Sequence, residues 1–161
     1  PKPMGSRHPS IAPFEAFKTK DSHIIIAAGN DKLFENLCNF LKISEISKDT
    51  KFITNSKRSE NMDELKIILE NKLKEKKTSE WVKGMEELKI PCGPIFNIKE
   101  AVENPQIKER NMIVKSFHKV VGEFRTAGNP IKMSSYNDAS TRGDIPDLDE
   151  HRDKIIKEFC N

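Results

Sequence analysis

The sequence lacks any long apolar run. Among its 161 residues, 35% are hydrophobic and 33% are charged. No stretch of about 18 consecutive apolar residues, the length that crosses a bilayer, is present. The net charge is only +3, with acidic and basic residues interleaved along the chain. A nucleic-acid-binding domain clusters lysine and arginine without matching acids, so neither a membrane nor a nucleic acid is an expected partner.

Cysteine is scarce and shows no motif spacing. Cys38, Cys92 and Cys160 lie far apart, and no signal peptide is recognisable at the start of the sequence. Scattered cysteines without a secretory signal are typical of reduced thiols in an intracellular protein. We therefore expect a cytoplasmic location, with a mitochondrial or peroxisomal one as the alternative for a eukaryotic source.

The common catalytic and cofactor motifs are also missing. The sequence contains no GxxxxGK[ST] phosphate loop, no GxGxxG and no GxSxG nucleophile elbow. A thiolate needs a base or a helix N-terminus beside it, and the setting of Cys92 between rigid turn residues favours packing instead. No metal site is predicted, because no histidine has a second ligand at short spacing. The histidines are His8, His23, His118 and His151. With the motifs above also missing, no self-contained catalytic site is predicted.

Strand-like segments are present towards both ends of the chain. FEAFK (14–18) and HIIIAA (23–28) are rich in aromatic and β-branched residues and flank a turn at 20–22. From Ile113 to about residue 133 the hydrophobic period falls to two, with turns near Gly122 and at 128–130. We expect the strands of both regions to share one antiparallel sheet.

Helical periodicity dominates the middle of the chain. Asn30 is placed to cap a helix with a continuous apolar stripe, and Asn61 begins another with Glu64 in capping-box spacing. Thr78 is predicted to cap a third helix, on which Trp81 sits at core spacing and is expected to pack. Later helices are predicted to begin at Asn97 and Asn104 and to cover 150–159. The pattern predicts an α+β fold, with a small antiparallel sheet and packed helices.

Six short segments of the sequence, in their order and with the gaps between them, resemble the sequences of one protein family. They are GSRHPSIAPFEAF, IIIAAGNDKLFENLCNFL, FITNSKRSENMDEL, IPCGPIFNIKEAVENPQIKERNMI, GNPIKM and PDLDEH. Together they are similar to the later part of a class III CoA-transferase, the family of formyl-CoA transferase, carnitine CoA-transferases and α-methylacyl-CoA racemase. The resemblance runs from about Gly5 to about Phe159, nearly the whole chain.

The resemblance implies that the reactive group lies outside these residues. In the family, a large Rossmann-like N-terminal domain binds coenzyme A and carries the catalytic aspartate, which forms an aspartyl-CoA thioester. This chain lacks that domain, so no catalytic residue is expected in it and the fragment alone is expected to be inactive. It corresponds to an interdomain and active-site loop (1–13), a small α+β domain (14–136), and a linker with the start of the return segment (137–161).

The resemblance also implies candidate site residues. Gly5, Ser6, Arg7 and His8 match a mobile loop that covers the active site in the transferases. Such a lid excludes water and offers hydrogen-bond donors to negative charge. The side chains of Arg7 and His8 add positive charge or hydrogen-bond donors that could contact a substrate carboxylate. Asp31 matches an acidic residue that supports a catalytic histidine in the racemase, and Asn30 precedes it; both also suit a helix start.

Three functions follow as hypotheses. The first is part of an acyl-CoA:carboxylate CoA-transferase that acts on an acyl-CoA and a small carboxylic acid, without a metal. The second is a 2-methylacyl-CoA racemase of the same family. The third is a non-catalytic interaction module that keeps the fold. The family's interlocked dimers imply a homodimer for the full-length protein.

Overall fold

The computed structural model describes residues 3–160. Pro1, Lys2 and Asn161 lie outside the described residues, so the first two positions of the predicted 1–13 loop are not placed. The chain divides into two compact units, Pro1–Ile95 and Phe96–Asn161. Each unit is described by itself below.

The first unit is built on a three-stranded antiparallel sheet. Strands β1 (Phe14–Lys18) and β2 (His23–Ala27) form the predicted hairpin, in which Phe14 lies opposite Ala27. Strand β3 (Cys92–Pro94) pairs with the other edge of β2, giving the order β1-β2-β3. Alternation along β1 and β2 buries Phe17, Ile24 and Ile26 completely. These side chains form the sheet's contribution to the core.

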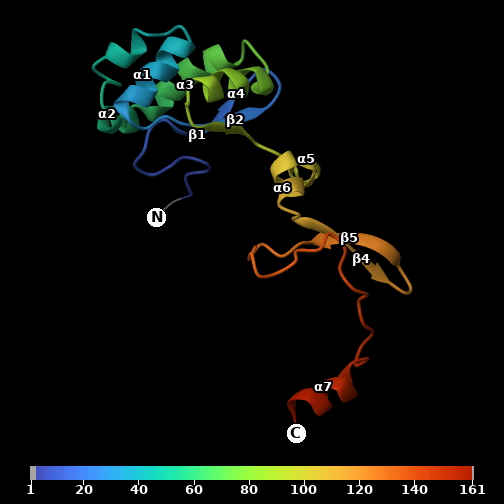
Figure 1. The fold of residues 1–161 in the computed structure, drawn as a ribbon. Coiled ribbons are helices and arrows are strands. Elements are labelled where there is room, and N and C mark those ends of the chain that lie inside the picture. Colours follow the sequence, from blue (N-terminus) through green and yellow to red (C-terminus); the bar gives the residue numbers. More distant parts are fainter. Residues whose placement is uncertain (1–2, 161) are drawn as a thin grey trace. The chain divides into compact units, whose positions relative to one another are not determined.

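Helices gather on one side of this sheet (Figure 1). Their apolar stripes bury Phe34, Leu37, Leu65, Leu69 and Met85 against the strands. Trp81 is buried as predicted, and its indole N–H donates to the carbonyl of Leu73 at 2.7 Å. The elements are α1 (Asp31–Phe40), the short 3-10 helix η1 (Ile46–Lys48), α2 (Asn55–Glu60), α3 (Met62–Leu73) and α4 (Thr78–Glu87).

At two predicted helix starts, the side chain named does not cap the helix. Helix α3 starts after Asn61, as predicted, but the side chain of Asn61 donates to the carbonyls of Lys51 and Lys57 and makes no capping hydrogen bond. Thr78 is the first residue of α4, and the carboxylate of Asp21, from the β1–β2 turn, accepts from its backbone N–H at 2.8 Å. Nearby carbonyls compete for the side chain of Asn61, whereas the partner of Thr78 lies 57 positions away in the sequence.

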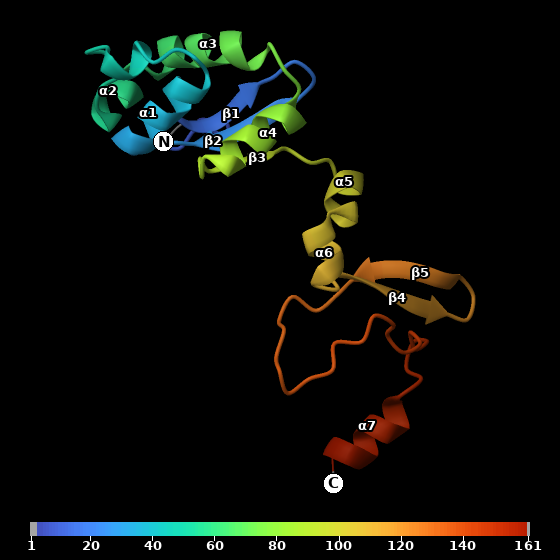
Figure 2. The same cartoon turned by 45° about the horizontal axis from the view of Figure 1, so that its top comes forward.

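The second unit contains the predicted short helices and a β-hairpin, which Figure 2 shows from a second direction. Asn97 and Asn104 cap α5 (Ile98–Glu103) and α6 (Pro105–Glu109) with their side chains. Strands β4 (Ile113–His118) and β5 (Gly122–Ala127) pair antiparallel, with Gly122 at a φ of +81° in the turn. Helix α7 (Arg152–Phe159) begins two residues later than predicted.

The prediction of one shared sheet is wrong. Strand β3 pairs with the edge of β2 that β1 leaves free. The sequence pattern predicted this segment to be a connector and not a strand. Strand β4 pairs with β5 and, at Lys115, with Thr141. The fold is α+β, with two small antiparallel sheets and packed helices. In residues 3–160 every helix is too short or too polar to cross a bilayer.

Candidate functional site

The predicted Gly5–His8 loop lies along strand β1. Gly5 has a φ of +63°, a left-handed conformation that favours glycine. The hydroxyl oxygen of Ser6 accepts from the backbone N–H of Ala16 at 3.0 Å. The backbone N–H of His8 donates to the carbonyl of Phe14 at 2.9 Å. The loop is therefore hydrogen-bonded to the sheet at two points.

Arg7 joins the loop to the body of the first unit. Its Nε donates to Glu15 at 3.0 Å, and its Nη2 donates to Asp63 at 2.7 Å. Glu15 is only 3% exposed and is also paired with Lys66, whereas Asp63 is 90% exposed. The hydrogen bond to Asp63 and the charge of Glu15 raise the pKa of Arg7, although partial burial opposes them. Arg7 thus neutralises a buried carboxylate and holds the loop in place.

His8 caps the turn that follows it. Its Nδ1 accepts from the backbone N–H groups of Ser10 at 3.2 Å and of Ile11 at 3.1 Å. The imidazole is stacked on Phe14, with ring centroids 5.3 Å apart and planes 7° apart. These contacts fix the orientation of the half-buried ring.

Asn30 and Asp31 form the start of helix α1. The side-chain oxygen of Asn30 accepts from the backbone N–H of Leu33 at 2.8 Å, which confirms the predicted cap. Asp31 lies in the first turn of the helix, where its charge suits the helix dipole. Its Oδ1 accepts from Nη2 of Arg58 at 2.9 Å. The carboxylate is 68% exposed, while Arg58 is completely buried.

Arg58 is a central residue that the sequence pattern did not single out. Its guanidinium donates to the carbonyls of Ala12 at 2.7 Å, Phe52 at 3.0 Å and Gly29 at 2.7 Å, as well as to Asp31. It also lies 4.6 Å from the centre of the Phe34 ring. Arg58 therefore connects the end of the loop to the turn that carries Asp31.

Asn55, one turn earlier on α2, makes a second connection. Its Oδ1 accepts from the backbone N–H of Ala12 at 2.9 Å, and its Nδ2 donates to the carbonyl of Ser10 at 2.8 Å. Helix α2 was not predicted, because NSKRSE has no apolar stripe. An arginine and an asparagine inside a polar segment give no sign of burial. In the structure, Arg58 and Asn55 nonetheless connect the end of the predicted loop to the turn that carries Asn30 and Asp31.

A small cavity of about 90 Å³ lies beside the loop. Arg7, His8 and Ile11 line it from the loop, and Ser59 and Met62 line it from the helices. His8 and Ser59 supply polar groups to the cavity, and the charge of Arg7 is already paired with Glu15 and Asp63. These groups suit hydrogen bonding to a ligand more than nucleophilic attack.

The two thiols of the first unit, Cys38 and Cys92, are not activated as nucleophiles. Burial raises the pKa of Cys38 to about 12 and also raises the pKa of Cys92. Both side chains are therefore protonated at neutral pH. Within residues 3–160 no group of three or more His, Cys, Asp or Glu side chains is placed to hold a metal ion.

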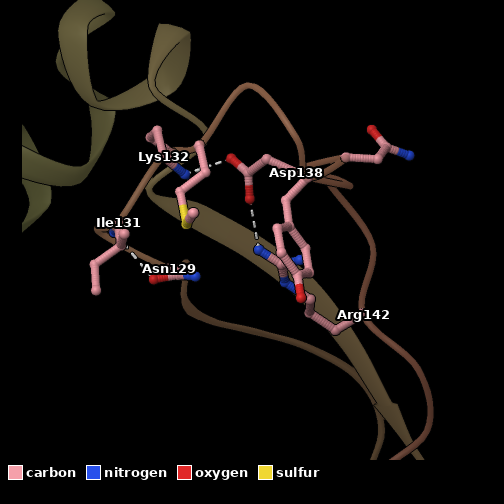
Figure 3. Close-up of a pocket in the computed structure, with 8 residues that line it drawn as sticks. Asn129, Ile131, Lys132, Asp138 and Arg142 are labelled. Atoms are coloured by element: carbon pink, nitrogen blue, oxygen red, sulfur yellow. Dashed lines mark hydrogen bonds and ion pairs between the residues drawn. The ribbon is translucent and has the colours of Figure 1, made fainter.

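A larger pocket of about 330 Å³ lies within the second unit, beyond β5 (Figure 3). Asp138 accepts from Lys132 and, at 2.8 Å, from Arg142. These two hydrogen bonds lower the pKa of Asp138 to about 2. Because Lys132 and Arg142 are both paired with Asp138, the pocket offers little unpaired positive charge. Residues 128–133 are irregular rather than the end of a strand.

Comparisons of this chain with known proteins all point to the same family. A sequence model described as "CoA-transferase family III" matches residues 1–152. The chain is 37% identical over 160 residues to the acetyl-CoA:oxalate CoA-transferase of Acetobacter aceti, covering 99% of this chain and 40% of that protein. It is 34% identical over 157 residues to the succinyl-CoA:glutarate CoA-transferase of Homo sapiens, covering 98% of this chain and 36% of that protein.

A solved structure agrees with these relatives. The crystal structure of a CAIB/BAIF family protein from Brucella suis matches 98% of this chain and 40% of its own, with a TM-score of 0.77 and 34% identity. The chain thus spans about two fifths of the length of the proteins it matches. At this identity the likeness extends beyond the overall fold to shared ancestry.

Proposed function

This chain belongs to CoA-transferase family III, and on that basis we propose that it is part of an acyl-CoA:carboxylate CoA-transferase. The observation that carries the proposal is the near-complete match of this chain, at 34–37% identity, to two enzymes named for CoA transfer to a carboxylic acid. Coenzyme A then enters as part of the acyl-CoA substrate, and no metal takes part.

A small dicarboxylic acid is the proposed acceptor. The names of the relatives specify oxalate and glutarate, which are acids with two carboxylates. The loop of this chain places Arg7 and His8 beside one small cavity. A hydrogen-bonding side chain at this point, in a loop that Arg7 holds in place, suits an acid that keeps one free carboxylate while the other reacts.

The proposed reaction proceeds through an aspartate outside residues 1–161. Its carboxylate attacks the acyl-CoA thioester, which gives a mixed anhydride and releases the CoA thiolate. The thiolate then attacks the aspartyl carbonyl, freeing the first acid and leaving an aspartyl-CoA thioester. The acceptor carboxylate repeats both steps in reverse and leaves as the new acyl-CoA. We propose that this chain contributes the loop that covers the acid during these steps.

The loop is suited to this role by its backbone as well as its side chains. Gly5 has no atom within 4 Å of where a Cβ would stand, so the start of the loop is unobstructed. The end of the loop is fixed at Ser10 and Ala12 by Asn55 and Arg58. Residues 6–8 are also anchored, through Ser6 and His8 to strand β1, so the loop is proposed to cover the reacting centre in this position. Held there, it would exclude water from the hydrolysable anhydride and thioester.

The racemase alternative is less well supported. It needs the carboxylate of Asp31 to support a catalytic histidine supplied from elsewhere. Here that carboxylate already accepts from the guanidinium of Arg58 at 2.9 Å, and this positive charge offsets its effect on a neighbouring imidazole. Asp31 and Asn30 are therefore proposed to support the site structurally, through the helix start and the contact with Arg58.

Trapping the covalent intermediate tests the proposed function. A full-length protein that contains this chain is mixed with succinyl-CoA in the absence of an acceptor and analysed by mass spectrometry. We expect an enzyme-CoA thioester that disappears when oxalate or glutarate is added, with formation of the new acyl-CoA. Failure to form any adduct or product with these acids would contradict the proposal and favour a non-catalytic module. The homodimer and the cytoplasmic location remain predictions for that protein.

A further inference from the structure

One of the two ring nitrogens of His8 is engaged within the protein. Nδ1 faces the backbone N–H groups of Ser10 and Ile11, at 3.2 Å and 3.1 Å. Both of these groups are donors, so Nδ1 must act as the acceptor and carry its lone pair towards them. The proton of the neutral ring consequently resides on Nε2.

The other nitrogen has no partner in the described part of the chain. No residue among 3–160 accepts a hydrogen bond from Nε2. The stacking on Phe14 holds the plane of the ring, and the two bonds to Nδ1 fix its rotation. Nε2–H is therefore a donor of fixed direction that points away from the turn at Ser10 and Ile11.

Arg7 is engaged at two of its three side-chain nitrogens, although it is the more obvious residue for binding an anion. Its Nε and Nη2 are held by Glu15 and Asp63. Withdrawing it would leave Glu15, which is 3% exposed, with Lys66 as its remaining cationic partner. Breaking one partner from a buried ionic group is costly. Arg7 is thus committed to holding the loop, while His8 is available to a ligand.

We propose that His8 binds a carboxylate oxygen of the acid substrate through its Nε2–H, and that Arg7 positions the loop without contacting that acid. This inference rests on the proposed CoA-transferase function and assigns the two basic residues of the loop to different tasks. His8 is one of the residues that line the cavity beside the loop, and the proposal places the acid there, against Nε2. A neutral donor to a carboxylate forms a charge-assisted hydrogen bond.

Two substitutions separate the task of each ring nitrogen. In His8→Asn, the amide oxygen replaces Nδ1 and keeps the turn at Ser10 and Ile11, but the donor at Nε2 is lost. In His8→Gln, the longer side chain places an N–H near the position of Nε2 but does not cap the turn. If His8 only stabilised the turn, His8→Asn would be less harmful than His8→Gln. A residue that binds the acid would show the reverse order in the kinetics.

Steady-state kinetics of the full-length protein with glutarate as acceptor provide the test. His8→Asn is expected to lower kcat/KM for the acid about 10-fold or more, the loss expected for a hydrogen bond to a charged group. His8→Gln is expected to stay closer to the wild type. The thermal unfolding midpoint of His8→Asn is expected to fall slightly, because the stacking on Phe14 is lost, and to stay above that of His8→Gln, which also loses the turn. Wild-type kinetics in His8→Asn, or a larger kinetic loss in His8→Gln, would overturn the inference.

The tautomer is an independent readout that does not need activity. In the 161-residue chain, ¹⁵N NMR of the His8 ring is expected to show the proton on Nε2 and a lone pair on Nδ1. A proton on Nδ1 would overturn the inference whatever the activity of the enzyme. If the wild-type full-length protein transfers no CoA to any acid, the proposed function fails instead, whereas the NMR result still stands.

Discussion

At the scale of single residues, the site depends on charges placed inside the protein. Arg58 is completely buried and Glu15 is 3% exposed. Charged residues are rarely buried without partners, because desolvation costs several kcal/mol per ion. Here the partners are three backbone carbonyls and Asp31 for Arg58, and two cations for Glu15. Each buried charge therefore fixes the backbone of a neighbouring segment.

Removing Arg58 should destabilise the first unit. In Arg58→Leu the carbonyls of Ala12, Phe52 and Gly29 lose their donor, and we expect the free energy of unfolding to fall by about 3 kcal/mol. Urea denaturation followed by the fluorescence of Trp81 measures this change. The control is Lys57→Leu, whose exposed ion pair with Glu60 should contribute at most about 0.5 kcal/mol. Equal stability of the two variants would show that Arg58 does not hold these segments together.

The cysteines should differ strongly in reactivity. Cys38 is completely buried and has a pKa of about 12, whereas Cys160 is exposed. Because the thiolate is the reacting species, iodoacetamide at pH 8 should modify Cys160 first and leave Cys38 unmodified until the protein unfolds. Peptide mass spectrometry gives the order. Rapid labelling of Cys38 in the folded chain would contradict the burial described here.

Residue-level prediction from sequence succeeds where the interaction is local. The cap at Asn30 depends on a group three residues away, and Trp81 follows from the helical period. The bonds of Arg58 to Ala12 and Gly29 span 46 and 29 positions in the sequence. Such contacts depend on how the elements pack, and no local pattern encodes them. The pairing of Arg7 with Asp63, across 56 positions, was missed for the same reason.

At the scale of elements, the loop and the turn before α1 are fitted to each other. A Cβ on Gly29 would lie 2.1 Å from Cγ2 of Ile11, which is closer than any real contact. Gly29 also presents its carbonyl to Arg58. A glycine is therefore needed here so that the loop can approach the turn closely.

Gly29→Ala should loosen the loop while the core stays intact. The added methyl group must displace the side chain of Ile11, and we expect this to disturb the end of the loop. We expect trypsin to cleave after Arg7 several-fold faster than in the wild type, as measured by mass spectrometry over time. Gly93→Ala is the matched control, because no atom lies within 4 Å of the added Cβ. Equal cleavage rates in both variants would contradict the close contact.

The loop that follows β5 should respond to acid. Lys132 and Arg142 lower the pKa of Asp138 from its ordinary value of 3.8 to about 2. A lowered carboxyl pKa stabilises the folded state above the ordinary value, and this contribution is lost as the pH falls through about 2. The ¹³C carboxyl signal of Asp138 should titrate near pH 2, and in Lys132→Met it should titrate at a higher pH. A wild-type midpoint near pH 4 would contradict the ion pairs seen in Figure 3.

At the scale of the whole molecule, the sequence pattern was sufficient for the α+β class and for both hairpins. It was not sufficient for the number of sheets. Three residues, Cys92–Pro94, complete the first sheet, and with two prolines nearby they resemble a connector. Short edge strands of this kind are defined by the neighbour they pair with, not by their own composition. The division at Ile95 and Phe96 has the same origin, because it follows from which strands pair.

The predicted boundaries at residues 13 and 136 concern the full-length protein and remain predictions. Large apolar side chains of the second unit are exposed, among them Ile131, Met133, Tyr136 and Leu148. Exposed apolar residues of this number favour association with another surface. We expect the 161-residue chain to self-associate at high concentration, as measured by sedimentation equilibrium. A monomer over the whole concentration range would count against this expectation.

The central claim is that these residues provide the acid-binding loop of a CoA-transferase whose nucleophile lies outside them. Its most direct test compares CoA transfer from succinyl-CoA to glutarate or oxalate by residues 1–161 alone and by a full-length protein that contains them. The account predicts turnover by the full-length protein and none by residues 1–161. Turnover by residues 1–161 alone, or no turnover by the full-length protein with either acid, would contradict it.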